Sequence, residues 1–395
     1  MDFYLVGPIF IFSYLENKLY KTGMTPLFVF LFPLTIAIIL AELLDNSLNL
    51  KEYKILIFNV SLIWFSLGVL IRLFFLLFPI KQKKIDIKKF PKLFYYIQIL
   101  VLIPLLITTI KAIFLLGITN IKGKARGIFA HIYILFSTFY LIPFYMNKKK
   151  FKKVYFIMTI VALLLHPKYE TFLFLLPLFF YQTYKSRKIF KFKVFIISLS
   201  LILLMFIIFF LTYYLNFKIN KLDYEFSDFL SFLIKHVQYY FLSPIYIGEY
   251  LLKYEKYGNP EVVVAPFLNI INWVQGDRNY IDTTLTFIDY LGIHSNVGGL
   301  IPELIYSIGK SGMYIFVTIL AIYSYIVENL LLRNEIWIFT SLILKATLFL
   351  CFFSNVFSVL GYVERILGTM LITIFIIIYQ IYQKSEYSKK HKKLK

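Results

Sequence analysis

Residues 243–284 read SPIYIGEYLLKYEKYGNPEVVVAPFLNIINWVQGDRNYIDTT and belong to a long segment of mixed polarity, residues 216–308. The rest of the chain consists mostly of apolar runs separated by short basic loops. Binding and catalytic residues lie disproportionately on loops that a rigid scaffold positions. We therefore expect any chemistry of this protein to lie in this segment, held at a membrane surface by the apolar runs.

Composition places the chain among membrane proteins. Of its 395 residues, 60% are hydrophobic and 20% aromatic, and the mean hydropathy is +0.75. Soluble domains are about half apolar and about a quarter charged. The sequence predicts an all-α polytopic integral membrane protein with about 10–11 transmembrane helices. One large extracytoplasmic loop, which contains short interfacial helices, is expected between them.

Ten apolar runs are expected to cross the membrane. They are residues 25–43, 55–80, 93–117, 128–146, 154–165, 171–184 and 194–215 before the large loop, and 313–332, 336–353 and 362–382 after it. Residues 3–15 are apolar but short, so they either add an eleventh span or lie at the interface. The expected domains are N-terminal transmembrane helices (1–215), the large loop (216–311), C-terminal transmembrane helices (312–383) and a basic cytoplasmic tail (384–395).

Lysine clusters set the expected orientation. KQKKIDIKK (81–89), NKKKFKK (147–153), KSRKIFKFK (185–193) and KKHKKLK (389–395) all fall on one side if the spans alternate. Positive charge concentrates in cytoplasmic loops, so the C-terminus is expected inside and the large loop outside. The same rule accounts for the net charge of +21 without nucleic acid as a partner.

Three arginines stand out because topology does not require them. Lysine greatly outnumbers arginine in this chain, yet Arg126, Arg278 and Arg365 all map to the outer side or its edge. A guanidinium forms planar, bidentate hydrogen bonds to phosphate oxygens, which suits binding of a pyrophosphate at a membrane interface. The alternative is a solvated loop residue or a local ion pair, such as Arg365 with Glu364.

Two residues are candidates for a general base. His294 lies in GIHSNVGGLIPEL, and a neutral imidazole can accept a proton from a sugar hydroxyl near neutral pH. Gly298 and Gly299 would allow close approach of the backbone to a ligand. Glu303, flanked by Pro302 and apolar residues, is expected to be desolvated, which would raise its pKa. The alternative for His294 is a hydrogen-bonding or surface residue.

The loop is also expected to form helices along the membrane surface. SDFLSFLIKHVQYYFLSPIYIGEYLLKY has helical apolar recurrence, which we expect Pro244 to interrupt. VVVAPFLNIINWV is expected to lie against the membrane surface, and GLIPELIYSIG is expected to form a short interfacial helix. The tyrosines of the large loop, among them Tyr250, Tyr254 and Tyr290, either stack on sugars or form an interfacial belt with Trp273.

Metal and nucleotide sites are not expected. The histidines lack metal-ligand spacing, and the sequence contains neither a phosphate-binding loop nor a dinucleotide fingerprint. The single cysteine, Cys351, lies in an apolar run and offers neither a disulfide framework nor a metal cluster. We expect no cofactor.

The chain resembles the Wzy-type polysaccharide repeat-unit polymerases, also called O-antigen polymerases, and less closely the O-antigen ligases. The resemblance rests on a late, large outer loop and on three segments. HSNVGGLIPELIYSIGKSG (294–312) resembles the family's segment of an amide or histidine, an acidic residue and paired glycines before a span, YYFLSPIYIGEYL (239–251) resembles its Ser-Pro segment, and GKARGIFAHIYILF (123–136) resembles its outer-loop arginine. In HPKYETFLFLL (166–176), Lys168 stands where relatives often have an arginine.

The resemblance implies a metal-independent membrane glycosyltransferase of the bacterial cytoplasmic membrane. It would transfer a glycan from undecaprenyl pyrophosphate to the terminal sugar hydroxyl of another lipid-linked unit, in lipopolysaccharide O-antigen, capsule or exopolysaccharide synthesis. Arg126, Arg278, Arg365 and Lys168 would bind the pyrophosphate, while His294 or Glu303 would deprotonate the acceptor. Implied partners are membrane lipid, the lipid-linked oligosaccharides, a chain-length regulator and a flippase.

Two other functions remain open. A ligase that moves the finished glycan to another acceptor would use the same parts. A flippase or exporter of lipid-linked sugars would favour more spans, charged residues within them and short loops, whereas charge within the spans is sparse here.

Overall fold

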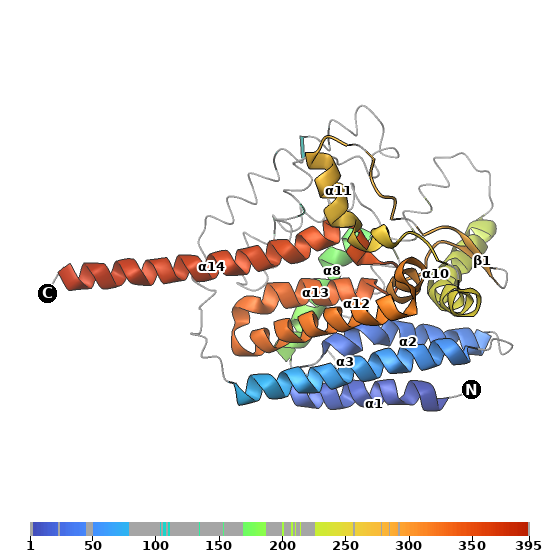
Figure 1. Ribbon diagram of the computed structural model, residues 1–395, viewed down its shortest axis with the longest axis horizontal. Coiled ribbons are helices and arrows are strands. Elements are labelled where there is room, and N and C mark those ends of the chain that lie inside the picture. The colour runs from blue at the N-terminus through green and yellow to red at the C-terminus, as the bar shows by residue number, and fades with distance from the viewer. Residues whose placement is uncertain are drawn as a thin grey trace. The chain divides into compact units, whose positions relative to one another are not determined.

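The computed structural model describes the N-terminal helices and most of the C-terminal half of the chain (Figure 1). The described residues are 3–22, 24–44, 50–78, 169–186, 226–255, 257–277, 279–283, 285–290 and 293–393, with scattered residues between 103 and 214. The chain divides into two compact units. The first comprises residues 1–77, 178–326 and 345–363, and the second comprises residues 78–177, 327–344 and 364–395.

The described elements are nearly all helical. In chain order they are α1 (Phe3–Tyr20), α2 (Pro26–Leu44), α3 (Lys51–Leu77), α8 (Tyr169–Ser186), α10 (Phe226–Tyr254), η4 (Pro260–Val264), α11 (Ala265–Val274), α12 (Leu300–Arg333), η5 (Glu335–Trp337), α13 (Ile338–Leu350), η6 (Val356–Ser358) and α14 (Leu360–Lys393). Between α11 and α12, the short strands β1 (Ile288–Tyr290) and β2 (Ile293–Ser295) form an antiparallel hairpin. The mainly helical class is confirmed, and the hairpin departs from the all-α prediction.

Four described helices are long and apolar enough to cross a membrane. They are Pro26–Leu44, Lys51–Leu77, Leu300–Arg333 and the part of α14 from Leu360 to Tyr379. They match the predicted runs 25–43, 55–80, 313–332 and 362–382. The membrane character of the chain is therefore confirmed, whereas the count of 10–11 spans and the sides of the loops stay predictions.

The remaining predicted runs have different outcomes. Residues 3–15 lie within α1, and the run 171–184 lies within α8. The run 336–353 is divided between η5 and α13, and α13 has only 13 residues, fewer than the roughly 20 that a spanning helix needs. The runs 93–117, 128–146, 154–165 and 194–215 lie almost entirely outside the described residues.

The core of the first unit is rich in aromatic side chains. Trp64 of α3 is fully buried and stacks on Phe30 of α2, with the ring centroids 4.7 Å apart. Tyr325 of α12 packs edge-on against Trp64 at 6.0 Å. Tyr20 at the end of α1 donates its hydroxyl to the Gly68 carbonyl oxygen at 2.7 Å. These contacts join α1, α2, α3 and the part of α12 that belongs to this unit, up to Ile326, into one body.

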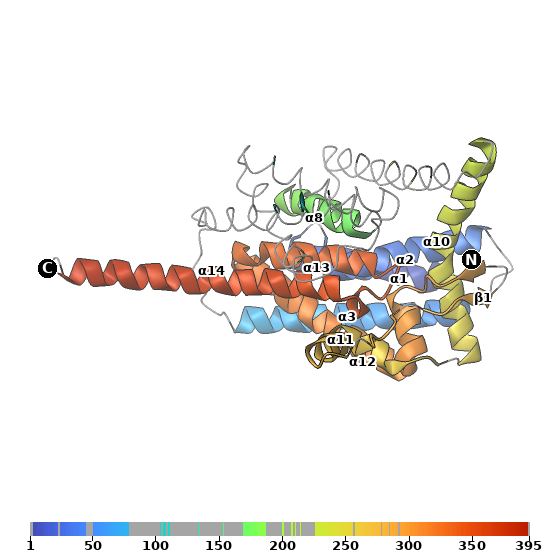
Figure 2. The same ribbon diagram turned by 90° about the horizontal axis from the view of Figure 1, so that it is seen from above.

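Helix α10 runs steeply across α2 and α3 and packs against both of them (Figures 1 and 2). The expected interruption at Pro244 is wrong, because α10 continues through it from Phe226 to Tyr254. A proline removes one helical hydrogen bond. Here its neighbours Ser243 and Ile245 are completely buried, so tertiary packing holds the helix together across this position.

The predicted short helix at GLIPELIYSIG exists as the first part of α12. Gly309 has φ 72° and ψ 174°, a conformation outside the helical region, and it breaks the long α12 after Ile308. Glycine reaches positive φ without the steric cost that a side chain brings. Residues 300–308 therefore form a short helix before the apolar run that begins at Met313.

A close junction joins the start of α12 to the turn that follows α13. The backbone N–H of Leu300 donates to the Cys351 carbonyl oxygen at 2.7 Å. Gly299 has φ 71°, and a Cβ there would lie 2.5 Å from the Phe352 carbonyl oxygen. In α10, Ser243 donates its hydroxyl to the Val297 carbonyl oxygen at 2.7 Å. Three segments far apart in the sequence thus meet at these residues.

In the second unit, Asn334 turns the chain from α12 into η5 and α13. Its side chain accepts a hydrogen bond from the Ile336 backbone N–H at 3.2 Å, as an N-cap residue does. Ser341 of α13 donates to the buried Glu328 of α12 at 3.0 Å. Helix α14 continues to Lys393, so most of the predicted basic tail, residues 384–395, is helical.

Replacing Gly299 with alanine should destabilise the protein by about 1–3 kcal/mol, because the side chain would enter the left-handed region and meet the Phe352 carbonyl. The measurement is the melting temperature of purified protein in detergent. Gly7→Ala in α1 is the matched control, since no atom lies within 4 Å of a Cβ there, and it should leave the melting temperature unchanged or raise it. Equal melting temperatures for Gly299→Ala and wild type would contradict the account of the junction.

Candidate functional site

Three tyrosines form an aromatic cluster outside the candidate spanning helices. Tyr250 and Tyr254 lie one turn apart near the end of α10, with their ring centroids 4.8 Å apart. Tyr290 of β1 lies 5.3 Å from Tyr250 and 6.3 Å from Tyr254. Tyr254 is 52% exposed, so its ring is open to a ligand. Such rings combine an apolar face with a polar hydroxyl, which suits the apolar faces and hydroxyls of a sugar.

A hydrogen bond to Glu249 attaches the C-terminal end of α10 to the start of α3. Its Oε2 accepts a hydrogen bond from the Tyr53 backbone N–H at 3.3 Å. Tyr53 lies in the first turn of α3, where backbone amides lack helical partners and the helix dipole favours negative charge. Gly248 permits the approach, because a Cβ there would lie 2.2 Å from the Tyr53 ring. The carboxylate is half-buried and sits beside the tyrosine cluster.

The charges around Glu249 pull its pKa in opposite directions. Burial raises the pKa of the Glu249 carboxyl, and the negative charge of Glu52 adds to that effect. The hydrogen bond from Tyr53 and the positive charges of Lys253 and Lys54 oppose it. Burial has the largest effect, so the pKa of Glu249 lies above its usual value. Lys253 also lies over the Tyr254 ring, 5.3 Å from its centroid, and brings a cation to the cluster.

The β-hairpin brings His294 to this region of the first unit. Both strands pack on α10, and the register places His294 of β2 opposite Asp289 of β1. Directly opposed positions on a face of a sheet are close neighbours. Asp289 is exposed and precedes Tyr290 of the cluster. One short hairpin thus carries the predicted base position, a carboxylate and one of the three tyrosines.

Glu303 lies in the junction at the start of α12 and is 5% exposed, so the expected desolvation is confirmed. Its Oε2 accepts a hydrogen bond from the Asn355 backbone N–H at 3.0 Å. The Gly298 backbone N–H donates to the same carboxylate. Glu303 therefore links the loop before α12 to the turn after α13, and this gives it a packing role alongside the predicted catalytic one.

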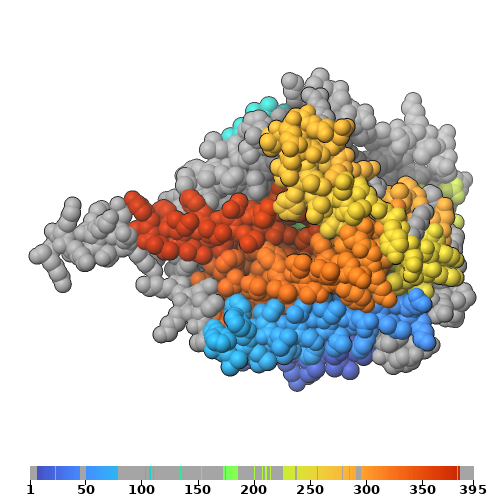
Figure 3. Space-filling model, in the orientation of Figure 1, coloured from blue at the N-terminus to red at the C-terminus, as the bar shows by residue number. Residues whose placement is uncertain are grey.

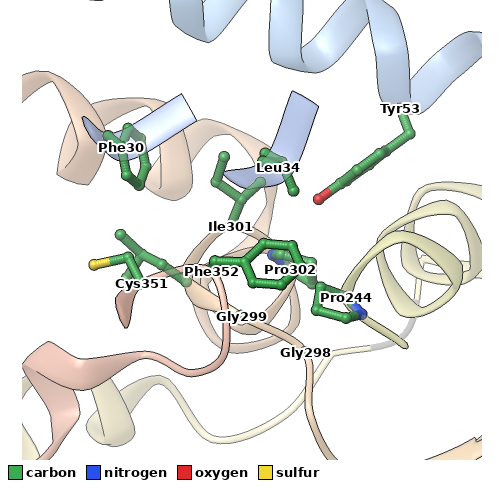
Figure 4. A pocket seen from close by; sticks show the side chains of 11 residues that line it. Phe30, Leu34, Tyr53, Pro244, Gly298, Gly299, Ile301, Pro302, Cys351 and Phe352 are labelled. Atoms are coloured by element: carbon green, nitrogen blue, oxygen red, sulfur yellow. The ribbon is translucent and has the colours of Figure 1, made fainter. Parts of the chain in front are cut away.

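A small pocket lies beside this junction (Figure 4). It is lined by Phe30, Leu34, Tyr53, Pro244, Gly298, Gly299, Leu300, Ile301, Pro302, Cys351 and Phe352. The Tyr53 hydroxyl points into it and has no hydrogen-bond partner among the described residues. The walls are otherwise mostly apolar side chains, so the pocket does not suit a glycan. The exposed tyrosine cluster is the better candidate site.

The paired glycines serve the packing of the protein itself. A Cβ at Gly298 would lie 2.9 Å from a Leu285 methyl carbon, and one at Gly299 would meet the Phe352 backbone. The close backbone approach that the glycines permit is therefore made to other parts of this chain.

The predicted phosphate-binding residues are placed only in part. Arg365 lies in α14 in the second unit and is 2% exposed, so its side chain is buried. Arg126, Arg278 and Lys168 lie outside the described residues. A role of these four residues in binding pyrophosphate stays a prediction.

Sequence reasoning did not identify Glu249 or Lys253 as site residues. The segment YIGEYLLKY contains a signal, because Glu249, Tyr250, Lys253 and Tyr254 recur at helical spacing and share one side of a helix. That signal alone does not reveal the contact with α3 or with Tyr290. Among the described residues, no group of three or more His, Cys, Asp or Glu is placed to hold a metal ion.

Comparison with known proteins gives no match. Neither a family model, nor a curated protein, nor a solved structure matches this chain.

The pKa of Glu249 predicts a pH-dependent stability. Because the folded pKa is raised above the unfolded value of about 4.3, the stability that the protonated carboxyl contributes is present below that pH. It is lost as the pH rises through the folded pKa. We expect the melting temperature of wild type to fall relative to that of Glu249→Gln as the pH rises from about 4 toward neutrality.

The measurement is thermal unfolding of both proteins in detergent across this pH range. Glu261→Gln, which changes an exposed carboxylate of η4, is the matched control. A wild type that gains stability over Glu249→Gln with rising pH would show the opposite sign. In that case the α3 amide and the nearby lysines, and not burial, would determine the direction of the shift in the Glu249 pKa.

Proposed function

We propose that the chain polymerises lipid-linked oligosaccharide repeat units. It would transfer a growing glycan from undecaprenyl pyrophosphate to the terminal sugar hydroxyl of another lipid-linked unit, on the outer side of the bacterial cytoplasmic membrane. The product would be an O-antigen, a capsule or an exopolysaccharide. The four candidate spans support a membrane location for this reaction.

The observation that carries the proposal is the cluster of Tyr250, Tyr254 and Tyr290 beside Glu249 and Lys253. Carboxylates accept hydrogen bonds from sugar hydroxyls, and aromatic rings pack on the apolar faces of sugar rings. A lysine ammonium is a compact charge for a phosphate oxygen. A glycan attached to a pyrophosphate lipid combines all of these groups.

The proposed chemistry is a displacement at the anomeric carbon. The acceptor hydroxyl oxygen forms the new glycosidic bond as its proton passes to a base, and the bond between the anomeric carbon and the pyrophosphate oxygen breaks. The pyrophosphate leaves with the electron pair, so the reaction requires neither a nucleotide nor an oxidant. We assign the base to His294 or Glu303. His294 is favoured, because its strand packs on the helix that carries the cluster.

Positive side chains would neutralise the departing pyrophosphate. We assign this role to Arg126, Arg278 and Lys168, as expected from the sequence, and Lys253 joins them on the geometry of the cluster. A chain-length regulator and a flippase for the lipid-linked unit are the protein partners that such a polymerase would need.

The test is the length distribution of surface glycan in a deletion strain complemented with wild type or variants. Tyr254→Ala and Glu249→Gln should reduce the amount of long polymer by roughly threefold to tenfold, since each removes one contact to the glycan. Tyr239→Ala is the matched control, because Tyr239 is an exposed tyrosine of the same helix outside the cluster. Protein levels in the membrane must be equal.

Each pattern has a definite meaning. A deletion that leaves cores capped with a single repeat unit supports the polymerase. Bare cores, with polymer accumulating on the lipid carrier, would instead identify a ligase. An unchanged ladder in the deletion strain would contradict both functions, and equal ladders for Tyr254→Ala, Glu249→Gln and Tyr239→Ala would remove the cluster from the site.

A further inference from the structure

Helix α11 has two faces of opposite character. Phe267, Ile270, Ile271 and Val274 recur at the spacing i, i+3, i+4 and i+7, which places them on one side of the helix. Asn269 and Asn272 fall on the opposite side. The helix contains no charged residue, so its only polar side chains are these two asparagines.

The polar face is occupied by the chain that follows α11. Asn269 accepts a hydrogen bond from the Ile281 backbone N–H at 2.8 Å and donates to the carbonyl oxygen of the same residue at 3.4 Å. Asn272 donates to the Asn279 carbonyl oxygen at 3.0 Å. Asn279 and Ile281 therefore lie along the asparagine side, and the hydrogen bonds fix which side of α11 faces the protein.

The apolar face is consequently left open. Phe267 is 55% exposed and Val274 is 72% exposed, while Ile270 and Ile271 are also exposed. Only Ala265 and Pro266, at the start of α11, are buried. Figure 3 shows this segment, in gold, at the surface of the molecule. An exposed apolar strip of this kind marks an interaction surface.

The position of α11 indicates what covers this strip. Both η4 and α11 contact η6, which ends at Ser358, and the candidate span of α14 begins at Leu360. Helix α11 therefore lies beside the end of a membrane-crossing segment. Its axis is steeply inclined to those of α2 and α3, which are candidate spans of the same unit (Figures 1 and 2). A helix in that orientation lies along the membrane plane when α2 and α3 cross the membrane.

Aromatic residues around α11 agree with this depth. Trp273 is 65% exposed on the flank of the apolar face, and Tyr257 and Tyr280, in the segments that precede η4 and follow α11, are also exposed. Tryptophan and tyrosine concentrate at the boundary between headgroups and acyl chains, because their rings have apolar and polar ends.

We infer that α11 is a membrane-surface anchor whose apolar face, Phe267, Ile270, Ile271 and Val274, inserts among the lipid acyl chains at the bilayer boundary. Because α11 carries no charge, its own insertion depends on apolar burial and not on anionic headgroups. The inference does not rest on the proposed polymerase activity. It concerns how the polar loop is held against the membrane.

The test is spin-label accessibility in the full chain reconstituted in phosphatidylcholine nanodiscs. Cys351 is replaced by alanine, and single cysteines are introduced as Phe267→Cys, Val274→Cys and, as the control, Glu261→Cys on the exposed side of η4. Labels at Phe267 and Val274 should collide with oxygen several-fold more often than with a water-soluble nickel complex, since oxygen concentrates in the acyl region. The label at Glu261 should show the reverse order.

Two outcomes would overturn the inference. If labels at Phe267 and Val274 meet the nickel complex more often than oxygen, the face is exposed to water. If they are shielded from both reagents, the face is covered by protein, either a second copy of the chain or a partner. Adding anionic lipid should leave the oxygen preference unchanged, and a preference that appears only with anionic lipid would contradict insertion by apolar burial alone.

Discussion

The described part of the first unit depends on hydrogen bonds to the backbone N–H and C=O groups at the ends of its helices, because these groups lie inside an apolar body. Each unpaired amide or carbonyl in such a medium costs several kcal/mol. The start of α12 and the turn after α13 supply partners for each other. The Leu300 amide donates to the Cys351 carbonyl oxygen, and the Glu303 carboxylate accepts from the backbone amides of Asn355 and Gly298. Ser243 attaches α10 to the same place through the Val297 carbonyl. Helix α10 is thereby fixed to the start of α12 and to the turn after α13, and Glu303 has a structural role whatever its chemistry.

A second carboxylate, Glu249 near the C-terminal end of α10, also accepts a hydrogen bond from a backbone amide, and it lies next to exposed side chains. Glu249 accepts a hydrogen bond from the first turn of α3, and this holds Tyr250 and Tyr254 beside Tyr290 of the hairpin. The exposed cluster and the apolar face of α11 both belong to the long segment of mixed polarity, residues 216–308. The tyrosine cluster suits a polar glycan, and the apolar face of α11 suits acyl chains. A lipid-linked sugar contains both parts, which is why this segment is the proposed place of the reaction.

The local sequence pattern predicted many of the helices, but few of the contacts that form the candidate site. The runs near α2 and α3 were predicted within a few residues, and VVVAPFLNIINWV, which contains α11, was expected to lie against the membrane surface. Pro244 was expected to break α10, because local chemistry favours a break, yet the completely buried Ser243 and Ile245 keep the helix intact. The glycines at 298 and 299 were assigned to a ligand, whereas the Phe352 backbone and Leu285 occupy the space that side chains would need. Glu249 was missed because its partner lies 196 residues away.

By itself, the sequence determined the membrane class, the positions of four candidate spans and the amphipathic character of the loop helices. These properties follow from composition and from periodicity over one or a few helical turns, because apolar side chains partition into lipid and polar side chains into water. Only the tertiary structure decided that Glu249 meets the first turn of α3, that His294 lies opposite Asp289, and that Asn269 and Asn272 turn α11 with its apolar face outward. Such contacts join residues from different elements, and they depend on which backbone groups remain unpaired once the helices have packed.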